Sequence, residues 1–512
     1  MALAREVSSR TDHADARQRC LAVREALIRA KLFSETATDS AGGTRWRVSP
    51  SPFLLSADHV RFFESLGTHL LAFNLALNRL YFESVHGTQP SWIAAYLDQG
   101  KPDSLIAYSR LDRFRDLLPD VIRPDVIPTD TGMVITELDS VPGGIGLTAC
   151  MARAYSEWQM AYSKAAEKNS ETPAISHKLS AISSEHFEVV GGPDGMLLGF
   201  AALLRERMEG RTGGVAIVVS EEARDYRPEM EWMAARLREQ DLAVFCVEPD
   251  EVDFTEDGLR LARDHRPIAL LYRFFELFDL TNVPKSELIM YAAKQGRVAV
   301  TPPFKPQLEE KLAFALFHHP ALTTFWQKEL GEDTCTVLAG VIPKTWILDP
   351  RPLPPAAVIP GLQLGGRAIA DWRDLGHATQ KGRRYVIKPS GFSPLAWGSR
   401  GVSVGHDLPQ SEWAAVIDQA LASFPTTPHI LQEFHKGRQF ELSYYNEAVQ
   451  DVVPMAGRAR LSPYYFVAEG KAELAGILAT VCPPDKKMIH GMKDAIMAPC
   501  AVAQGQSESH KV

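Results

Sequence analysis

The sequence predicts an α/β protein, because strand-like and helix-like segments alternate through its middle. Residues 214–220 are a short run of Val, Ala and Ile, Pro228–Gln240 is amphipathic, and Leu242–Val247 is apolar again. Two further observations extend this prediction: helical periodicity fills the N-terminal region, and a strand–loop–strand pattern surrounds Lys388. Together these patterns predict helices packed against sheets in more than one layer.

Length and composition set the broad class. With 512 residues, 45% of them hydrophobic, the chain can bury more than one core. Its formal net charge of −8 argues against nonspecific nucleic-acid binding. The six cysteines have no paired spacing, which favours a reducing compartment over zinc or disulfides. No signal-peptide pattern and no run of about 20 apolar residues is present, so we expect a cytoplasmic protein that makes no membrane contact.

The N-terminal region is predicted to be mostly helical. Apolar residues recur at three- and four-residue spacing in Arg17–Leu32 and in His59–Val85. Met151–Lys168 shows the same periodicity. Before that helix, the glycines of 143–146 could present N–H groups to a substrate anion, or could simply form a tight turn.

The middle of the chain is predicted to form a Rossmann-like layer at 209–304. After the first two strands, Ile268–Tyr272 and Val298–Val300 are apolar, with the helical segment Pro284–Gln295 between them. Strands that alternate with helices in this way are typical of a parallel sheet.

Residues 385–405 carry the most informative motif. An apolar run delivers Lys388 to the end of a strand, a loop containing Gly398 and Gly401 follows, and a second strand begins near Val402. A cation beside a loop whose N–H groups can turn inward suits nucleotide phosphates. Because a strand follows the loop, the motif differs from the phosphate loop that precedes a helix, and it indicates a lid over ATP.

Three other segments are expected to complete a nucleotide site. Lys311 is predicted within a helix, Gln307–Phe317, and would also face phosphate. The strand His429–Phe434 would meet the adenine edge, and the strand Phe440–Asn446 would pair with it antiparallel and hold the ribose. The residues expected to contact the nucleotide in these two strands are Gln432, Glu433, Phe434 and Glu441. Taken alone, each of these charged residues is more often a solvated surface group.

Metal ligands are expected near residue 130. Glu137 and Asp139 lie two apart on a predicted strand and therefore face the same side. A turn at 130–132 would set Arg123 and Asp125 beside them in a hairpin. Carboxylate oxygens suit magnesium, and an arginine suits a transferring phosphate.

In a nucleotide site of this kind, the acidic pair that holds magnesium ordinarily follows the nucleotide-binding strands in the sequence. Residues 450–480, where it would be expected, contain no convincing Glu-x-Asn pair. With the acidic residues placed early, the chain resembles the circularly permuted ATP-grasp ligases, the glutathionylspermidine synthase-like group. Arg123-Pro-Asp125 matches the Arg-x-Asp motif of that group. Glu137-Leu-Asp139 matches its Glu-x-Asn motif, except that Asp replaces Asn. The resemblance extends over about 115–470.

The resemblance implies a permuted ATP-grasp fold with a Rossmann-like pre-ATP-grasp domain and a helical N-terminal region. The expected divisions are 1–114 (helical region), 115–208 (acidic part), 209–304 (pre-ATP-grasp domain), 305–484 (nucleotide-binding part) and 485–512 (tail). It also implies ATP and Mg²⁺ as cofactors. Arg123 would be catalytic, together with Arg458 or Arg460, of which Arg460 is preferred.

The activity that the resemblance implies is an ADP-forming carboxylate–amine ligase. It would join a small carboxylate to an amine of the amino-acid, peptide or polyamine class through an acyl phosphate. Two alternatives remain open: an ATP-grasp phosphotransferase, and a nucleotide-binding scaffold without turnover, which Asp139 in place of Asn would favour.

Overall fold

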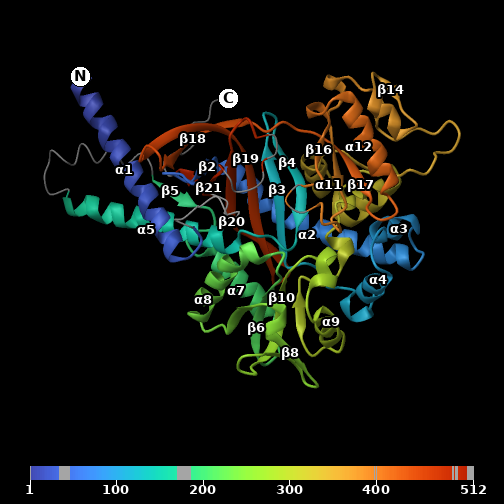
Figure 1. The fold of residues 1–512 in the computed structure, drawn as a ribbon, viewed down its shortest axis with the longest axis horizontal. Coiled ribbons are helices and arrows are strands. Elements are labelled where there is room, and N and C mark those ends of the chain that lie inside the picture. The colour runs from blue at the N-terminus through green and yellow to red at the C-terminus, as the bar shows by residue number, and fades with distance from the viewer. Residues whose placement is uncertain are drawn as a thin grey trace.

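The structure is a computed structural model that describes residues 2–33, 46–169, 186–396, 398, 400–486, 489 and 494–503. Within these residues several sheets pack between helices, so the predicted α/β class is confirmed. Figure 1 shows long strands at the centre, a second sheet with its helices below them, and a smaller sheet to one side. Across the described ranges, no helix combines the length and apolar character needed to cross a membrane.

The long helices predicted near the N-terminus are present as α1 and α2, and the one predicted at 151–168 lies within α5. The helices of the described residues are α1 (Ala2–Arg29), α2 (Ala57–Val85), α3 (Trp92–Asp98), α4 (Asp103–Ser109), α5 (Ile145–Asn169), α7 (Gly195–Arg207), α8 (Arg227–Arg238), α9 (Ser286–Lys294), α10 (Leu312–Phe317), α11 (Thr323–Val341) and α12 (Gln410–Ala422).

The central sheet has nine strands among the described residues and runs in the order β1-β21-β20-β19-β3-β4, with β18 also paired to β19 and β2 and β5 to β21. These strands are β1 (Arg47–Val48), β2 (Phe53–Leu55), β3 (Val121–Pro128), β4 (Met133–Asp139), β5 (Phe187–Val189), β18 (Gln439–Asn446), β19 (Asp451–Ala468), β20 (Lys471–Cys482) and β21 (Ile496–Ala503). The predicted hairpin at 121–139 is thus confirmed as β3–β4, and it pairs with a strand encoded more than 300 residues later.

Helices cover both faces of the central sheet. Tyr465 on β19 belongs to the core that contains α2, whereas its neighbour Tyr464 belongs to the core that contains α5 and α7. On the α2 side the helix approaches the strands closely at Gly67. A Cβ atom there would lie 2.5 Å from the carbonyl oxygen of Ala472 and 2.6 Å from the Tyr465 ring. A residue without a side chain is therefore required for α2 to lie this close to the sheet.

The parallel layer predicted in the middle of the chain is present. Its strands are β6 (Gly214–Val219), β7 (Val244–Val247), β8 (Val252–Thr255), β9 (Gly258–Leu261), β10 (Pro267–Phe274) and β11 (Ala299–Thr301). Strands β7, β6, β10 and β11 are parallel neighbours, as expected. The antiparallel pair β8–β9 was not predicted; it extends the sheet beside the start of β10.

The motif around Lys388 lies in a separate antiparallel sheet of four strands, β12 (Thr345–Ile347), β15 (Tyr385–Pro389), β16 (Ser403–Val404) and β17 (His429–Glu433), in the order β12-β17-β15-β16. The predicted strand–loop–strand is therefore β15 and β16. The chain enters this sheet at Thr345 and leaves it after Glu433, and Thr345 is the register partner of Gln432. A small hairpin, β13 (Gln363–Leu364) and β14 (Arg367–Ala368), lies in the same part of the chain.

Two predicted elements are wrong. Residues 440–446 form a strand, β18, but it pairs with β19 in the central sheet and not with β17, so the segment between β17 and β18 crosses from one sheet to the other. Gln307–Phe317 is not one helix: a 3₁₀ turn, Pro306–Leu308, precedes α10, and Lys311 lies in the turn between them.

The outermost divisions also need correction. The region 1–114 contributes β1, β2 and α2 to the central sheet and its core. The expected tail 485–512 contains β21, a buried strand that pairs with β20, while 504–512 lie outside the described residues. Segments from both the N-terminal and the C-terminal region are thus built into the central sheet.

Replacing Gly67 with alanine should destabilise the protein by about 1–3 kcal/mol, because the added methyl group must displace either backbone or a buried ring. The matched control is Gly340→Ala on α11, where a Cβ atom would have no neighbour within 4 Å. Thermal unfolding of both variants tests this: the first should unfold at a lower temperature, and the second at the wild-type temperature or slightly above. Equal unfolding temperatures would contradict the close approach of α2.

Candidate functional site

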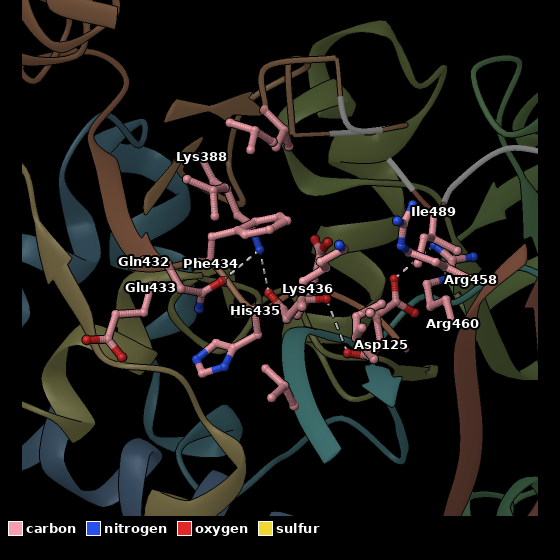
Figure 2. A pocket seen from close by; sticks show the side chains of 18 of the residues that line it. Asp125, Lys388, Gln432, Glu433, Phe434, His435, Lys436, Arg458, Arg460 and Ile489 are labelled. Carbon is pink, nitrogen blue, oxygen red and sulfur yellow. Dashed lines mark hydrogen bonds and ion pairs between the residues drawn. The ribbon is translucent and has the colours of Figure 1, made fainter. Parts of the chain in front are cut away.

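A cavity of about 330 Å³ lies between the β3–β4 hairpin, the four-stranded sheet and the segment that follows β17. Figure 2 shows side chains from these elements pointing into it. The residues singled out from the sequence that line the cavity are Asp125, Glu137, Lys311, Lys388, Gln432, Glu433, Phe434, Arg458 and Arg460. Segments separated by more than 300 residues are therefore brought to one place.

Lys388 projects from β15 toward the acidic hairpin. Its Nζ atom donates to the main-chain oxygen of Thr136 on β4 at 2.9 Å and to Oε1 of Gln432 at 2.8 Å (Figure 2). Burial, with the nearby charge of Lys311, lowers the pKa of Lys388 to about 8. Both hydrogen-bond acceptors of Lys388 are uncharged. A strong anion could therefore still form an ion pair with its ammonium group.

Lys311 lies at the start of α10 and forms an ion pair with Glu137. Burial disfavours its charge, but Glu137 and other carboxylates hold the pKa of Lys311 above the usual value. Both lysines therefore meet the β3–β4 hairpin, one through a carboxylate and the other through a main-chain carbonyl.

A buried carboxylate, Glu310, fixes the position of both lysines. It accepts hydrogen bonds from Lys101 Nζ at 2.7 Å, Ser390 Oγ at 2.6 Å and the Gly391 main-chain nitrogen at 3.0 Å. The side chains of Lys101 and Glu310 are fully buried. Despite that burial, these donors keep the pKa of Glu310 below its usual value. No local pattern predicts this network, because Lys101 lies far away in the chain.

The hairpin places its four charged residues on one face. Arg123 is the register partner of Asp139, and Asp125 that of Glu137. Opposite residues in an antiparallel pair share a face, as do residues two apart on one strand. The guanidinium of Arg123 forms ion pairs with Asp125, at 2.9 Å, and with Asp139.

Asp125 is buried among cations. Arg460 Nη1 lies 3.0 Å from its Oδ2 atom, and Ser462 Oγ donates to Oδ1 at 3.2 Å. Burial alone would raise the pKa of Asp125, but Arg123 and Arg460 outweigh it and lower that pKa below 3.8. Asp125 is therefore charged throughout the neutral range.

The carboxylate oxygens present in the cavity are suitable ligands for magnesium. Asp125 and Glu137 are paired across the hairpin, and both line the cavity. Magnesium is usually held by one or two carboxylates together with substrate phosphates. The two carboxylates here are therefore of the right kind and number. In the present arrangement each carboxylate is paired with a cation, and the described residues contain no group of three or more His, Cys, Asp or Glu that could hold a metal ion.

Some predicted residues do not reach the cavity. Gly398 and Gly401 are not among the lining residues; the loop between them includes residues outside the described set. Glu441 is exposed on β18, opposite Ala456, and lies outside the lining. Arg123 and Asp139 border the cavity only through their ion pairs with Asp125 and with each other.

Other lining residues were not singled out from the sequence. Lys436 lies in the segment that crosses between the sheets, and His406 contacts the Phe434 ring at a centroid distance of 4.6 Å. The sequence predicts a hairpin turn at the Lys436 segment, because a hairpin and a crossing between sheets have the same local pattern. Among the described residues, five Lys and Arg side chains and four Asp and Glu side chains line the cavity.

The glycine turn at 143–146 does not hold an exogenous anion. The Glu229 carboxylate on α8 accepts from the main-chain nitrogens of Gly144, at 2.6 Å, and Leu147, at 3.0 Å. Burial raises the pKa of Glu229 to about 7. A carboxylate of the protein itself, that of Glu229, therefore occupies the anion position at the N-terminus of α5.

Comparisons with known proteins show the fold. No family model matches the chain, and no curated protein matches its sequence. Among solved structures, a glutathione synthetase-like effector from Globodera pallida is 12% identical with a TM-score of 0.55, over 95% of this chain and 96% of that chain. A protein named "putative gamma-glutamylcysteine synthetase" from Methylobacillus flagellatus KT is 9% identical over 87% of this chain and 89% of that chain, with a TM-score of 0.39. The first similarity shows a glutathione-synthetase-like fold that extends over nearly the whole chain.

Replacing Asp125 with asparagine should destabilise the protein by about 3 kcal/mol, because two buried guanidinium groups lose their shared counter-charge. Asp130→Asn, in the exposed turn of the same hairpin, is the control and should have little effect. Because the pKa of Asp125 is lowered on folding, its contribution is present above about pH 4 and lost as the pH falls through the folded value. Denaturation at pH 7 and at pH 3 measures both; an equal loss in the two variants would contradict the pairing.

Proposed function

We propose that the protein is an ATP- and Mg²⁺-dependent ligase that joins a small carboxylate to an amine. One observation carries the proposal: Lys311, Lys388, Asp125 and Glu137 line a single cavity beside the Gln432–Phe434 segment. Such a set can serve a triphosphate and its metal together, because the lysines suit phosphate oxygens and the carboxylates suit magnesium.

The charges of the cavity favour a ligand that brings both signs. Basic and acidic lining residues nearly balance, so a polyanion alone would leave the carboxylates facing it, and a metal alone would leave the lysines without anions. The Nε atoms of Arg123 and Arg460 are also buried without a hydrogen-bond partner among the described residues. A nucleotide that enters with magnesium would satisfy both sets of groups.

Asp125 and Glu137 would hold the magnesium, with Asp139 beside them. A magnesium ion held there would neutralise negative charge that develops on the phosphates during transfer. Asp139, where the resembled group has Asn, is already compensated by Arg123. The extra negative charge is thus neutralised within the hairpin.

On nucleotide binding, the side chains of the cavity would exchange partners. Phosphate oxygens would compete with Glu137 for Lys311, and with Gln432 for Lys388. This exchange would free Glu137 for the metal. Arg460, already 3.0 Å from Asp125, is placed to stabilise charge on the transferred phosphoryl group.

The base and sugar would lie against the end of β17. Gln432, Glu433 and Phe434 line the cavity there, with the His406 ring on Phe434. Glu433 is better placed than Glu441 to bind the ribose hydroxyls, because it lines the cavity and Glu441 does not. The loop with Gly398 and Gly401 would cover the phosphates, which protects an acyl phosphate from water.

The order of the elements supports a permuted ATP-grasp arrangement. The acidic hairpin β3–β4 precedes the lysine-bearing sheet by about 200 residues, yet both line the cavity. The glutathione-synthetase-like fold agrees with this arrangement. Ligases of this kind work on small substrates, and the amino-acid, peptide and polyamine classes remain the candidates.

The proposed reaction has two steps. A carboxylate oxygen of the first substrate attacks the γ-phosphorus, and the bond to the ADP oxygen breaks, giving an acyl phosphate. The amine nitrogen of the second substrate then attacks the carbonyl carbon, phosphate leaves, and the nitrogen loses a proton to give the amide. ADP and phosphate are both released.

A nucleotide-binding scaffold without turnover is the second candidate, favoured by Asp139 in place of Asn. A phosphotransferase would retain the same lysines but leave the phosphate on its acceptor.

Product analysis distinguishes the three. With pools of amino acids and polyamines, the ligase should release ADP and free phosphate only when acid and amine are both present. Arg460→Gln should slow release by about 100-fold to 1000-fold, as loss of one transition-state donor does. Arg373→Gln is the control, since Arg373 pairs with Asp418 at an exposed position and does not line the cavity. ADP without free phosphate would indicate the phosphotransferase, and nucleotide binding without ADP the scaffold.

ATP binding should take up protons at pH 8.5. The pKa of Lys388 is about 8 before binding, so part of its population is neutral there, and a nearby triphosphate favours the ammonium form. Affinity should therefore fall as the pH rises above 8. Calorimetry with a non-hydrolysable analogue and Mg²⁺, in two buffers of different ionisation enthalpy, measures the uptake. Lys388→Arg should abolish it, because guanidinium stays charged; unchanged uptake in that variant would assign the proton to another group.

A further inference from the structure

A second cavity of about 330 Å³ shares no lining residue with the first. It lies between the N-terminal region, the end of α7 and the β11 side of the parallel layer. Three arginines line it, Arg113 from the N-terminal region and Arg207 and Arg211 from the end of α7 and the residues just after it. Three aromatic rings, Tyr108, Phe114 and Phe304, form part of its wall.

We propose that this cavity is a separate binding site for a small organic anion, a carboxylate or phosphate ester with a planar apolar body. Ligand cavities in proteins are mostly apolar with a few polar groups that fix orientation. Here the aromatic wall would take the body of the ligand, and the guanidinium groups would take its charge.

Two of the arginines have no acidic partner in the part of the chain that the structure describes. Among the described residues, neither Arg113 nor Arg211 forms an ion pair; Arg113 donates to the main-chain oxygens of Ala293 and Lys294, and Arg211 to that of Gly296 at 3.1 Å. These carbonyls close the C-terminal end of α9. Each guanidinium carries five N–H donors, so such contacts hold it in place and leave donors for an anion.

The acidic residues of the cavity have partners other than Arg113 and Arg211. Asp120 is buried and accepts two hydrogen bonds from Arg207 and one, at 2.6 Å, from the Thr301 hydroxyl. Glu206 accepts from the main-chain nitrogen of Glu469 at 2.6 Å. Asp120 is thus paired with Arg207, and among the described residues neither carboxylate forms an ion pair with Arg113 or Arg211.

The aromatic wall is held in shape before any ligand binds. Tyr108 stacks on Phe114 at a centroid distance of 4.8 Å, and its hydroxyl donates to the Met290 main-chain oxygen at 2.8 Å. Lys305 Nζ donates to the main-chain oxygens of Phe114 and Leu117, at 3.2 and 2.9 Å. A preformed wall lowers the entropic cost of binding.

The bland alternative is that Arg113 and Arg211 only complement the carbonyls at the end of α9, as cations at a helix C-terminus commonly do. If the arginines only complement the helix end, there is no reason for an anion that carries an aromatic group to bind in the cavity. The test therefore uses a matched pair of probes, 2-naphthoate and its neutral analogue 2-naphthamide.

Titration calorimetry of the full chain should show saturable binding of 2-naphthoate and weaker binding of 2-naphthamide. Arg113→Gln/Arg211→Gln should lose about tenfold or more in affinity for the acid alone, as expected for lost charge-assisted bonds. Arg205→Gln is the control: this arginine is on α7, donates to the Gln240 main-chain oxygen and lies outside the cavity. Should the double variant not fold, Arg211→Gln, at an exposed position, carries the same test.

A second measurement locates the site. Saturating Mg²⁺ and a non-hydrolysable ATP analogue should leave 2-naphthoate binding intact, because the two cavities share no residue. The proposal is overturned if the analogue displaces the probe, if the acid and the amide bind alike, or if the arginine variants bind the acid as well as the wild type does. It stands independently of the ligase activity, since the readout is binding alone.

Discussion

The geometry of the main cavity depends on one buried carboxylate, Glu310. A buried charge is tolerated only where it is paired and hydrogen-bonded, and Glu310 finds its partners in Lys101 and in the Ser390–Gly391 turn. Lys311 is its neighbour in the chain, and Lys388 precedes Ser390 by two residues. The same interaction that neutralises Glu310 therefore sets the separation of the two lysines. Gly391 permits it, since a Cβ atom there would lie 2.0 Å from the Glu309 main-chain oxygen.

Around that fixed frame, the charged groups of the cavity are paired with one another. Glu137 meets Lys311, and Asp125 meets Arg460. Such pairs offset the cost of burying each charge, so the protein keeps a highly charged interior without ligand. A ligand that carries charges of both signs can replace both partners of a pair at once. This property, more than any single residue, makes the cavity suited to a metal-bound polyanion.

The sequence predicted what depends on local spacing. The alternation of strands and helices predicted the parallel layer, and the two-residue spacing of Glu137 and Asp139 predicted their common face, which the register of the hairpin shows. Prediction from the sequence failed where contacts between residues far apart in the chain determine the structure. The helix predicted at 307–317 is interrupted where Glu309 and Glu310 form their contacts, and Lys101 is too far away in the chain to signal this. Likewise β18 pairs with β19 and not with β17, and nothing in the five residues between β17 and β18 predicts that pairing.

The entry and exit of the four-stranded sheet are adjacent, because Thr345 and Gln432 are register partners. Residues 345–433 are therefore an insertion that begins and ends at neighbouring positions. If they were removed, the chain on either side could be joined directly. The peptide backbone restrains this insertion along one edge only. Its orientation toward the acidic hairpin must be set by side chains, chiefly Lys388 on the Thr136 oxygen and the Glu310 network. Together with the hydrogen bonds of Tyr96 to Asp349 and of Gln99 to the Pro425 main-chain oxygen, these contacts hold an insertion of nearly ninety residues against the rest of the protein, and a ligand that competes for Lys388 would act directly on one of them.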